Sequence, residues 1–250
     1  REDLTPYSYA FRAHEKQTGG LELMRALLAI HYPVPDDLRL FVLYSQLNQG
    51  DALKMAVTYW RSRMFRTSGC LIWQLNDCWP VISWSLIDYG LNPKAAYYYV
   101  KRTCQPIIAP IIVKEGQAQI HIINETNTPL SARLKLQVMT FGGEVLFDEV
   151  VEKQVPAYTS MLGIAKMMDD LPLNSNYILV STLTNKDEVL YVDSRTVAEP
   201  KALKLPPSKV QSTVSQVDDK TFEVTLTSDI YAKALKLDAA DLKAKWSDNF

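Results

Sequence analysis

Apolar residues follow a helical spacing in the first part of the chain and a strand spacing over most of the rest. In residues 18–31 they recur every three or four positions, which predicts an amphipathic helix that stops at Pro33. Asp36 and Asp37 lie where an N-cap and a first-turn acid are expected, and a longer amphipathic helix is predicted from there to about Arg66. Gly50 is expected to mark a kink within it.

The segment directly after these helices has a different pattern. Residues 69–75, GCLIWQL, are short and continuously apolar, which is typical of a strand buried on both faces of a parallel sheet or barrel. Residues 76–92 then form a loop rich in aromatic side chains, and a short helix is predicted over residues 93–102. In an α/β barrel the active site lies at the C-terminal ends of the strands, so this loop is the place to look for chemistry.

From Pro106 onward the pattern changes to short strands separated by turn residues. The predicted strands are residues 107–113, 117–124, 133–140, 145–151, 177–184 and 189–192. Their spacing indicates an immunoglobulin-like β-sandwich over residues 106–200. A proline-rich linker at residues 200–208 and two further strands, at 210–217 and 222–227, predict the start of a second sandwich in residues 201–250.

Composition excludes several classes of protein. Hydrophobic residues make up 47% and charged residues 22% of the chain, as in a globular protein with a real core. The formal net charge of -1 argues against a nucleic-acid partner, and no apolar run approaches the ~20 residues that cross a membrane. Three cysteines and three scattered histidines fit neither a disulfide framework nor a zinc site. We therefore expect buried free thiols, no metal and no cofactor.

The aromatic loop carries the candidate chemistry. Three of the five tryptophans, Trp73, Trp79 and Trp84, fall within or next to it, and Asn76 and Asp77 come directly after the apolar run. Aromatic faces beside an amide and a carboxylate suit a sugar, because rings cover its C–H faces and polar groups bind its hydroxyls. From spacing alone two alternatives stay open: the tryptophans could be core residues, and Asn76 and Asp77 could only form a turn.

A resemblance extends this interpretation. The stretch WQLNDCWPVISWSLIDY, residues 73–89, with Lys94 and Arg102 beyond it, resembles the end of the catalytic barrel in glycoside hydrolase family 2, and its β-mannosidase branch in particular. Residues 41–66 resemble the helix that precedes the final barrel strand of that family. The sandwich domains match more loosely, by their order and size.

The resemblance implies a fold class of α/β plus all-β. Residues 1–105 would be the last part of a (β/α)8 TIM barrel, residues 106–200 an immunoglobulin-like β-sandwich, and residues 201–250 the start of a second, truncated β-sandwich. Because the chain opens on Arg1 without a methionine, we expect it to be a piece of a longer protein. It would then pack against the N-terminal part of the same protein.

The resemblance also implies a reaction. Family 2 enzymes are retaining glycosidases that use two glutamates ~5–5.5 Å apart, and the β-mannosidases release terminal β-mannose from oligosaccharides. In the family both glutamates precede the region covered here. The surroundings of Glu2, Glu15 and Glu22 match neither of them, so no catalytic residue is assigned.

The resemblance gives site roles residue by residue. Trp73 is expected to form a wall of the sugar pocket. Asn76, Asp77 and Trp79 are expected to contact the sugar or to hold the loop. Lys94 could reach a substrate group or remain a surface charge, and His14, in a polar segment, could lie near the mouth of the pocket.

Two alternatives to a β-mannosidase remain at this point. One is another family 2 activity, such as exo-β-glucosaminidase, β-galactosidase or β-glucuronidase. The other is a non-catalytic carbohydrate-binding module. The second is disfavoured, because a lone barrel strand with its flanking helices would leave an apolar face uncovered. The expected partner is a β-mannoside oligosaccharide, with no nucleic acid and no membrane.

Overall fold

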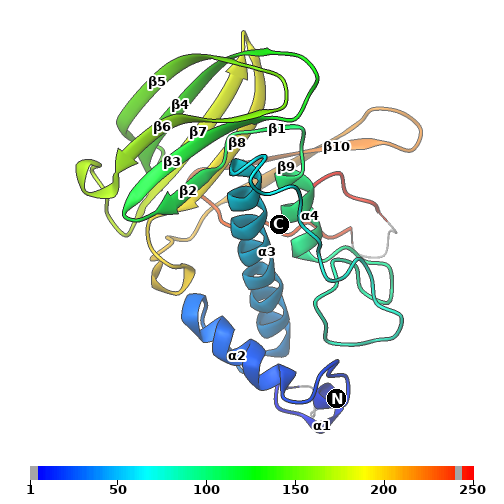
Figure 1. Cartoon of the computed structure of the whole chain (residues 1–250). Coiled ribbons are helices and arrows are strands. Elements are labelled where there is room, and N and C mark those ends of the chain that lie inside the picture. Colours follow the sequence, from blue (N-terminus) through cyan, green and yellow to red (C-terminus); the bar gives the residue numbers. More distant parts are fainter. Residues whose placement is uncertain (1–4, 240–243) are drawn as a thin grey trace.

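The computed structural model describes residues 5–239 and 244–250. The α-helices come first: α1 is Tyr9–Arg12, α2 is Gly20–His31, α3 is Leu38–Ser62 and α4 is Ala95–Thr103. The long α3 runs from α2 to the β-sheets (Figure 1). Of the two acids predicted at its start, Asp37 is the N-cap, because its carboxylate accepts a hydrogen bond from the Leu40 amide at 2.9 Å. It ends at Ser62, one turn before the predicted Arg66.

The helices share one apolar core. It buries Leu21 and Leu28 of α2, Phe41 and Leu47 of α3, and Tyr99 of α4. Gly50, expected to kink α3, has a packing role instead. The helix continues through it, and a Cβ there would lie 2.9 Å from the Tyr99 ring, so glycine allows α4 to approach closely.

The β-sandwich forms as predicted in outline, from two antiparallel sheets. In one, β3 (Gln117–Asn124) pairs with β1 (Ile107–Ile108), β2 (Ile111–Lys114) and β6 (Thr159–Met167). The other has the order β5-β4-β7-β8, with β4 at Leu130–Thr140, β5 at Val145–Val155, β7 at Tyr177–Asn185 and β8 at Glu188–Thr196. Inward-facing side chains of both sheets, including Ile120, Ile122, Leu134, Leu136 and Leu179, are fully buried between them.

Two short 3₁₀ helices lie after the strands of the sandwich, at Met168–Asp170 after β6 and at Pro200–Ala202 after β8. The second falls in the predicted linker. Beyond it, β9 (Val210–Gln216) and β10 (Phe222–Ser228) form a hairpin whose side chains are mostly exposed. The chain then contacts both larger parts: Tyr231 stacks on Phe141, just after β4 of the sandwich, at 5.5 Å between ring centroids, and Phe250 joins the helical core.

A buried carboxylate joins α3 to the sandwich. Asp193 of β8 accepts hydrogen bonds from the Lys54 ammonium of α3 and, at 2.9 Å, from the Ile111 amide of β2. Two further contacts reinforce the junction. Arg61 of α3 pairs with Glu125, just after β3, at 2.9 Å, and the hydroxyl of Ser160 on β6 donates to the Ser62 carbonyl at 2.9 Å. Helix and sandwich therefore form one connected unit.

Residues 69–75 do not form the buried strand predicted for them. They pair with no strand among the described residues, and their apolar side chains face solvent, with Leu71 100%, Trp73 73% and Leu75 62% exposed. The pattern indicates a segment suited to burial, but burial on both faces also requires neighbouring strands and helices to cover it. No described element lies in those positions.

Two other sequence-based expectations can be checked here. The three cysteines are free thiols, but Cys78 and Cys104 are exposed and only Cys70 is half-buried, so the expectation of buried thiols was wrong. Across residues 5–239 and 244–250, no helix has both the length and the apolar character needed to cross a membrane.

Candidate functional site

The loop at residues 76–92 folds back on itself beside the start of α4. The Asp77 amide donates to the Ile87 carbonyl at 3.2 Å, and the Ile87 amide donates to the Leu75 carbonyl at 2.9 Å. The Lys94 amide, at the N-cap of α4, donates to the Leu86 carbonyl at 2.9 Å. These backbone contacts give the loop a fixed shape despite its lack of regular strands.

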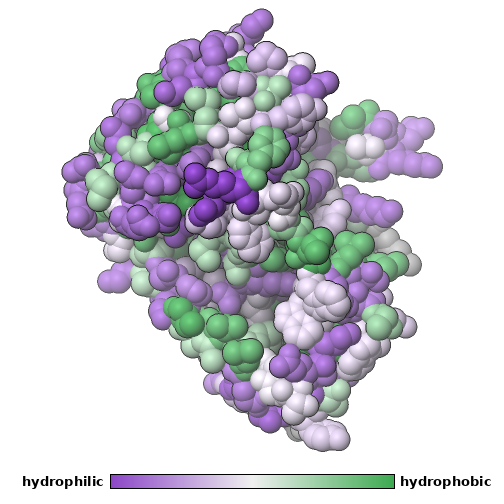
Figure 2. Space-filling model, in the orientation of Figure 1, coloured by the Kyte–Doolittle hydropathy of each residue, from purple (hydrophilic) through white to green (hydrophobic). Residues whose placement is uncertain are grey.

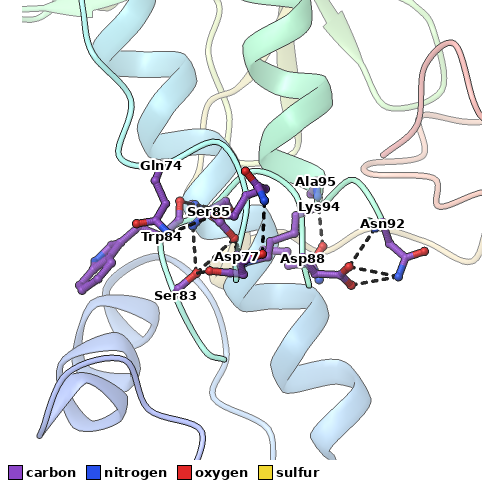
Figure 3. Close-up of polar contacts among 12 residues, drawn as sticks. Gln74, Asp77, Ser83, Trp84, Ser85, Asp88, Asn92, Lys94 and Ala95 are labelled. Carbon is purple, nitrogen blue, oxygen red and sulfur yellow. Dashed lines mark hydrogen bonds and ion pairs between the residues drawn. The ribbon is translucent and has the colours of Figure 1, made fainter. Parts of the chain in front are cut away.

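Asp77 is the centre of a buried polar network inside the loop. Only 3% of the residue is exposed, and its carboxylate accepts hydrogen bonds from Ser83 Oγ at 2.6 Å and Ser85 Oγ at 2.5 Å. Lys94 Nζ lies 3.5 Å from the carboxylate and donates to Ser85 Oγ at 2.7 Å. Figure 3 shows these groups turned toward one another, while the indole of Trp84 points away.

The electrostatics of the network are balanced within it. Burial alone would raise the pKa of Asp77, but the hydrogen bonds from Ser83 and Ser85 and the charge of Lys94 outweigh it and hold that pKa below its ordinary value. Burial lowers the pKa of Lys94, opposed by the carboxylates of Asp77 and Asp88. The carboxylate is therefore kept ionised, and its negative charge is compensated by the hydroxyls of Ser83 and Ser85 and the ammonium of Lys94.

Neighbouring helices hold the loop from the outside. Gln49 of α3 donates from Nε2 to the Trp84 carbonyl at 2.7 Å. The side chain of Gln46, also on α3, accepts from the Ala95 amide at 3.1 Å, which ties α3 to the start of α4. At the far end of the loop, Asp88 accepts from the backbone amide of Asn92 at 2.8 Å. The loop is thus fixed to α3, α4 and its own backbone.

The exposed side of the loop carries the aromatic residues. Trp73 and Trp79 both reach solvent, and the peptide bond between Trp73 and Gln74 is cis. Asn76 is exposed, with its amide nitrogen 3.3 Å from the carbonyl of Asp77. The ring of His14 stacks on Trp79, at 6.1 Å between centroids and 21° between planes. Aromatic faces and an amide therefore line one side, and the ionised carboxylate lies beneath.

The structure thus separates the four predicted site residues into two groups. Trp73, Asn76 and Trp79 are accessible to a ligand, whereas Asp77 has both oxygens engaged within the loop. Lys94 is not the surface charge considered from the sequence, since its side chain is only 13% exposed.

Sequence analysis assigned no role to Ser83 or Ser85. Their signal was present: two hydroxyls one residue apart, placed after the acid, can reach the same carboxylate. Among the described residues no three His, Cys, Asp or Glu side chains are grouped as a metal site would require.

Family models match both β-regions of the chain. A mannosidase immunoglobulin/CBM-like domain model matches residues 116–202, and an immunoglobulin-fold domain model matches residues 205–250. Similar proteins include β-mannosidase B of Aspergillus niger, 25% identical over 211 residues and 76% of this chain. Another is β-mannosidase B of Thermothelomyces thermophilus, 41% identical over 156 residues and 59% of this chain.

A solved structure extends the likeness to the whole chain. The β-D-mannosidase of Dictyoglomus thermophilum matches 100% of this chain with a TM-score of 0.90 and 30% identity. The chain is a relative of the β-mannosidases. It corresponds to the C-terminal part of these family 2 enzymes, a helical segment followed by immunoglobulin-like domains.

The chain covers only part of each relative. It spans 25% and 18% of the two fungal β-mannosidases and 30% of the Dictyoglomus enzyme. The exo-chitosanase of Amycolatopsis orientalis shares the fold over 83% of this chain and 28% of its own, with a TM-score of 0.65 and 20% identity.

Proposed function

We propose that this chain is the C-terminal portion of a retaining, exo-acting β-mannosidase that removes terminal β-D-mannose from oligosaccharides or glycoconjugates. The observation that carries the proposal is the match to a β-D-mannosidase over the entire chain, at 30% identity and a TM-score of 0.90. That match spans the helices and the aromatic loop as well as the sandwich, so it includes the region with the candidate sugar-binding residues.

In this proposal the loop forms one wall of the sugar pocket. Trp73 covers an apolar face of the terminal mannose, and Asn76 and Trp79 offer further contacts on the exposed side. Asp77 acts from beneath, because its carboxylate holds Ser83, Ser85 and Lys94 and so fixes the loop that presents the aromatic rings.

The same proposal accounts for the exposed apolar segment. Residues 69–75 would be the last strand of a (β/α)8 barrel, with the preceding strands supplied by the N-terminal part of the protein. Pairing there would cover Leu71 and Leu75, which are now exposed. Residues 1–105 would then complete the barrel, followed by the sandwich at 106–200 and a second β-domain at 201–250.

The two catalytic carboxylates would come from the N-terminal part as well. Glu15 accepts a hydrogen bond from the Leu21 amide at 3.3 Å, and Glu22 pairs with Arg12 at 3.0 Å on the surface. Glu2 lies outside the described residues. Because Glu15 and Glu22 are each engaged with a neighbour, we assign neither of them to the pair ~5–5.5 Å apart that a retaining glycosidase uses.

Initial rates of the full-length protein test the proposal. On nitrophenyl β-mannoside, β-glucosaminide and β-galactoside, we expect a clear preference for the mannoside. Preference for either of the other two would reject the β-mannosidase assignment. The 250-residue chain alone serves as the control, and it should show no measurable turnover because it lacks the positioned acid and nucleophile.

A further inference from the structure

His14 and Trp79 form a paired aromatic surface on the exposed side of the loop, and the proposed pocket wall gives His14 no role. The Ile82 amide donates to the His14 carbonyl at 2.7 Å, and the Lys16 amide donates to the Ile82 carbonyl at 3.3 Å. These bonds join the N-terminal segment to the aromatic loop like two short strands. They fix the backbone of His14 beside Trp79, and the two rings stack 6.1 Å apart.

One contact settles which nitrogen of His14 faces outward. Its Nδ1 lies 2.5 Å from the Pro80 carbonyl oxygen. A carbonyl can only accept, so Nδ1 carries the proton, and the Nε2 of the neutral imidazole is left as an acceptor. The residue is exposed, and within the part of the chain that the structure describes no group bonds to Nε2.

We propose that His14 and Trp79 bind the second sugar of the oligosaccharide substrate, with the Trp79 ring against a C–H face and His14 Nε2 accepting a hydroxyl. The inference rests on the proposed function. An exo-acting enzyme encloses the terminal sugar, so the rest of the oligosaccharide leaves through the mouth of the pocket. An aromatic pair open to solvent, with Trp79 on the loop that follows Trp73, suits that outgoing sugar.

The test compares substrates with and without a second sugar, using the full-length protein. His14→Phe keeps a stacked ring but removes the acceptor, whereas His14→Ala removes both. For β-1,4-mannotriose, His14→Phe should raise KM about fivefold to tenfold, as expected for one lost hydrogen bond, and His14→Ala should raise it further. For nitrophenyl β-mannoside, which has no second sugar, both variants should match the wild type.

A matched control is His31→Phe, because His31 is an exposed histidine on α2 that pairs with Glu199 instead of the loop. It should behave as the wild type on both substrates. Equal losses on both substrates for the His14 variants, or no loss on mannotriose for His14→Phe, would overturn the inference.

Binding separates this inference from the proposed function. Titration of mannotriose into the wild type and His14→Phe, followed by tryptophan fluorescence, needs no turnover. If the wild type binds mannotriose more tightly but hydrolyses no β-mannoside, the sugar site stands and the proposed function fails. If the two proteins bind mannotriose equally, the sugar site is wrong whatever the activity.

Discussion

The β-sandwich (residues 106–200) buries many of its large apolar side chains, whereas the helical part (residues 5–105) leaves many of its own exposed. In the sandwich, two sheets enclose a continuous core, and Ile120, Leu134 and Leu179 have no exposed surface. In the helical part, Leu71 and Trp73 lie open to solvent, and further apolar side chains are exposed on α2, as the green surface over that helix shows (Figure 2). The sandwich therefore buries its core between its own two sheets, whereas residues 5–105 leave apolar side chains that another surface would have to bury.

The energetic difference follows from burial. Each Å² of apolar surface removed from water contributes roughly 25 cal/mol, so a core closed on both sides stabilises its own fold. The exposed apolar side chains of the helical part contribute nothing until another surface covers them. In our proposal, the surface that covers them is the N-terminal part of the barrel.

The largest expected effect comes from cutting the chain between the two regions. Residues 106–203 expressed alone should unfold cooperatively in urea, because their core is intact. Residues 5–105 alone should show no cooperative transition, since their core is small and their apolar face stays open. Near-ultraviolet circular dichroism during urea titration measures both. A cooperative transition in the helical fragment would show that residues 5–105 are stable without a covering surface.

Removing the buried acid of the loop should be nearly as severe, but local. Asp77→Ala leaves Lys94 buried without its partner, which should cost about 3–5 kcal/mol of loop stability. Tryptophan fluorescence in urea should report an early transition of the loop, with the sandwich transition unchanged. The double variant Asp77→Ala, Lys94→Met removes both charges and should recover part of the loss. A cost equal to the sum of the two single variants would refute the pairing.

A matched pair of leucines tests the comparison directly. Leu134→Ala creates a cavity between the two sheets and should lower the free energy of unfolding by about 3 kcal/mol. Leu71→Ala removes the same atoms from an exposed position and should change it by less than about 0.5 kcal/mol. Urea midpoints of the 250-residue chain give both values. In the full-length protein, Leu71→Ala should become destabilising if the proposed strand is buried there.

The proposed pocket wall should affect activity and leave the fold intact. Trp73→Ala in the full-length protein should lower kcat/KM on nitrophenyl β-mannoside about 100-fold, through the loss of contact with the sugar ring. Trp84→Ala is the control, because that indole points away from the Asp77 network and has no assigned sugar contact. Unchanged kinetics for Trp73→Ala would show that this wall does not touch the substrate.

Acid should loosen the loop before it affects the sandwich. The folded pKa of Asp77 lies below its ordinary value of ~3.9, so the unfolded loop binds the proton more readily as the pH falls. The stabilisation is complete above the ordinary pKa and is lost as the pH falls through the folded pKa. Tryptophan fluorescence between pH 6 and 2 follows it, and Asp77→Asn should remove this transition. A transition that persists in Asp77→Asn would exclude Asp77 as its source.

Regular patterns predicted much of the fold. The spacing of apolar residues located α2 and α3, and the pair Asp36 and Asp37 marked the start of α3, because an N-cap needs only local geometry. Strand β6 was missed, since TSMLGIAKM lacks a clean alternation. Gly163 within it lies so close to Leu134 that a Cβ would approach to 2.5 Å, a packing reason that no local pattern reveals.

In the candidate site too, local sequence predicted some features, whereas others depend on contacts with residues elsewhere in the chain. Composition located the aromatic loop; Trp73 beside it and Trp79 within it are exposed, and their contact with a sugar stays a prediction. The Asp77 side chain points inward because Ser83, Ser85 and Lys94, which come later in the sequence, bind its carboxylate. The exposure of residues 69–75 depends on which elements lie beside them, which their own sequence does not encode.

Helix α3 connects the sandwich to the loop through two side-chain contacts, one at Asp193 and one at Trp84. Lys54 bonds to Asp193 from the same helix on which Gln49 holds the loop, five residues earlier. At 1.5 Å of rise per residue, only about 7.5 Å of helix axis separates the two attachments. Rotating the sandwich about α3 would take the Lys54 ammonium away from the buried Asp193 carboxylate, so this contact favours one fixed orientation of the sandwich relative to the loop.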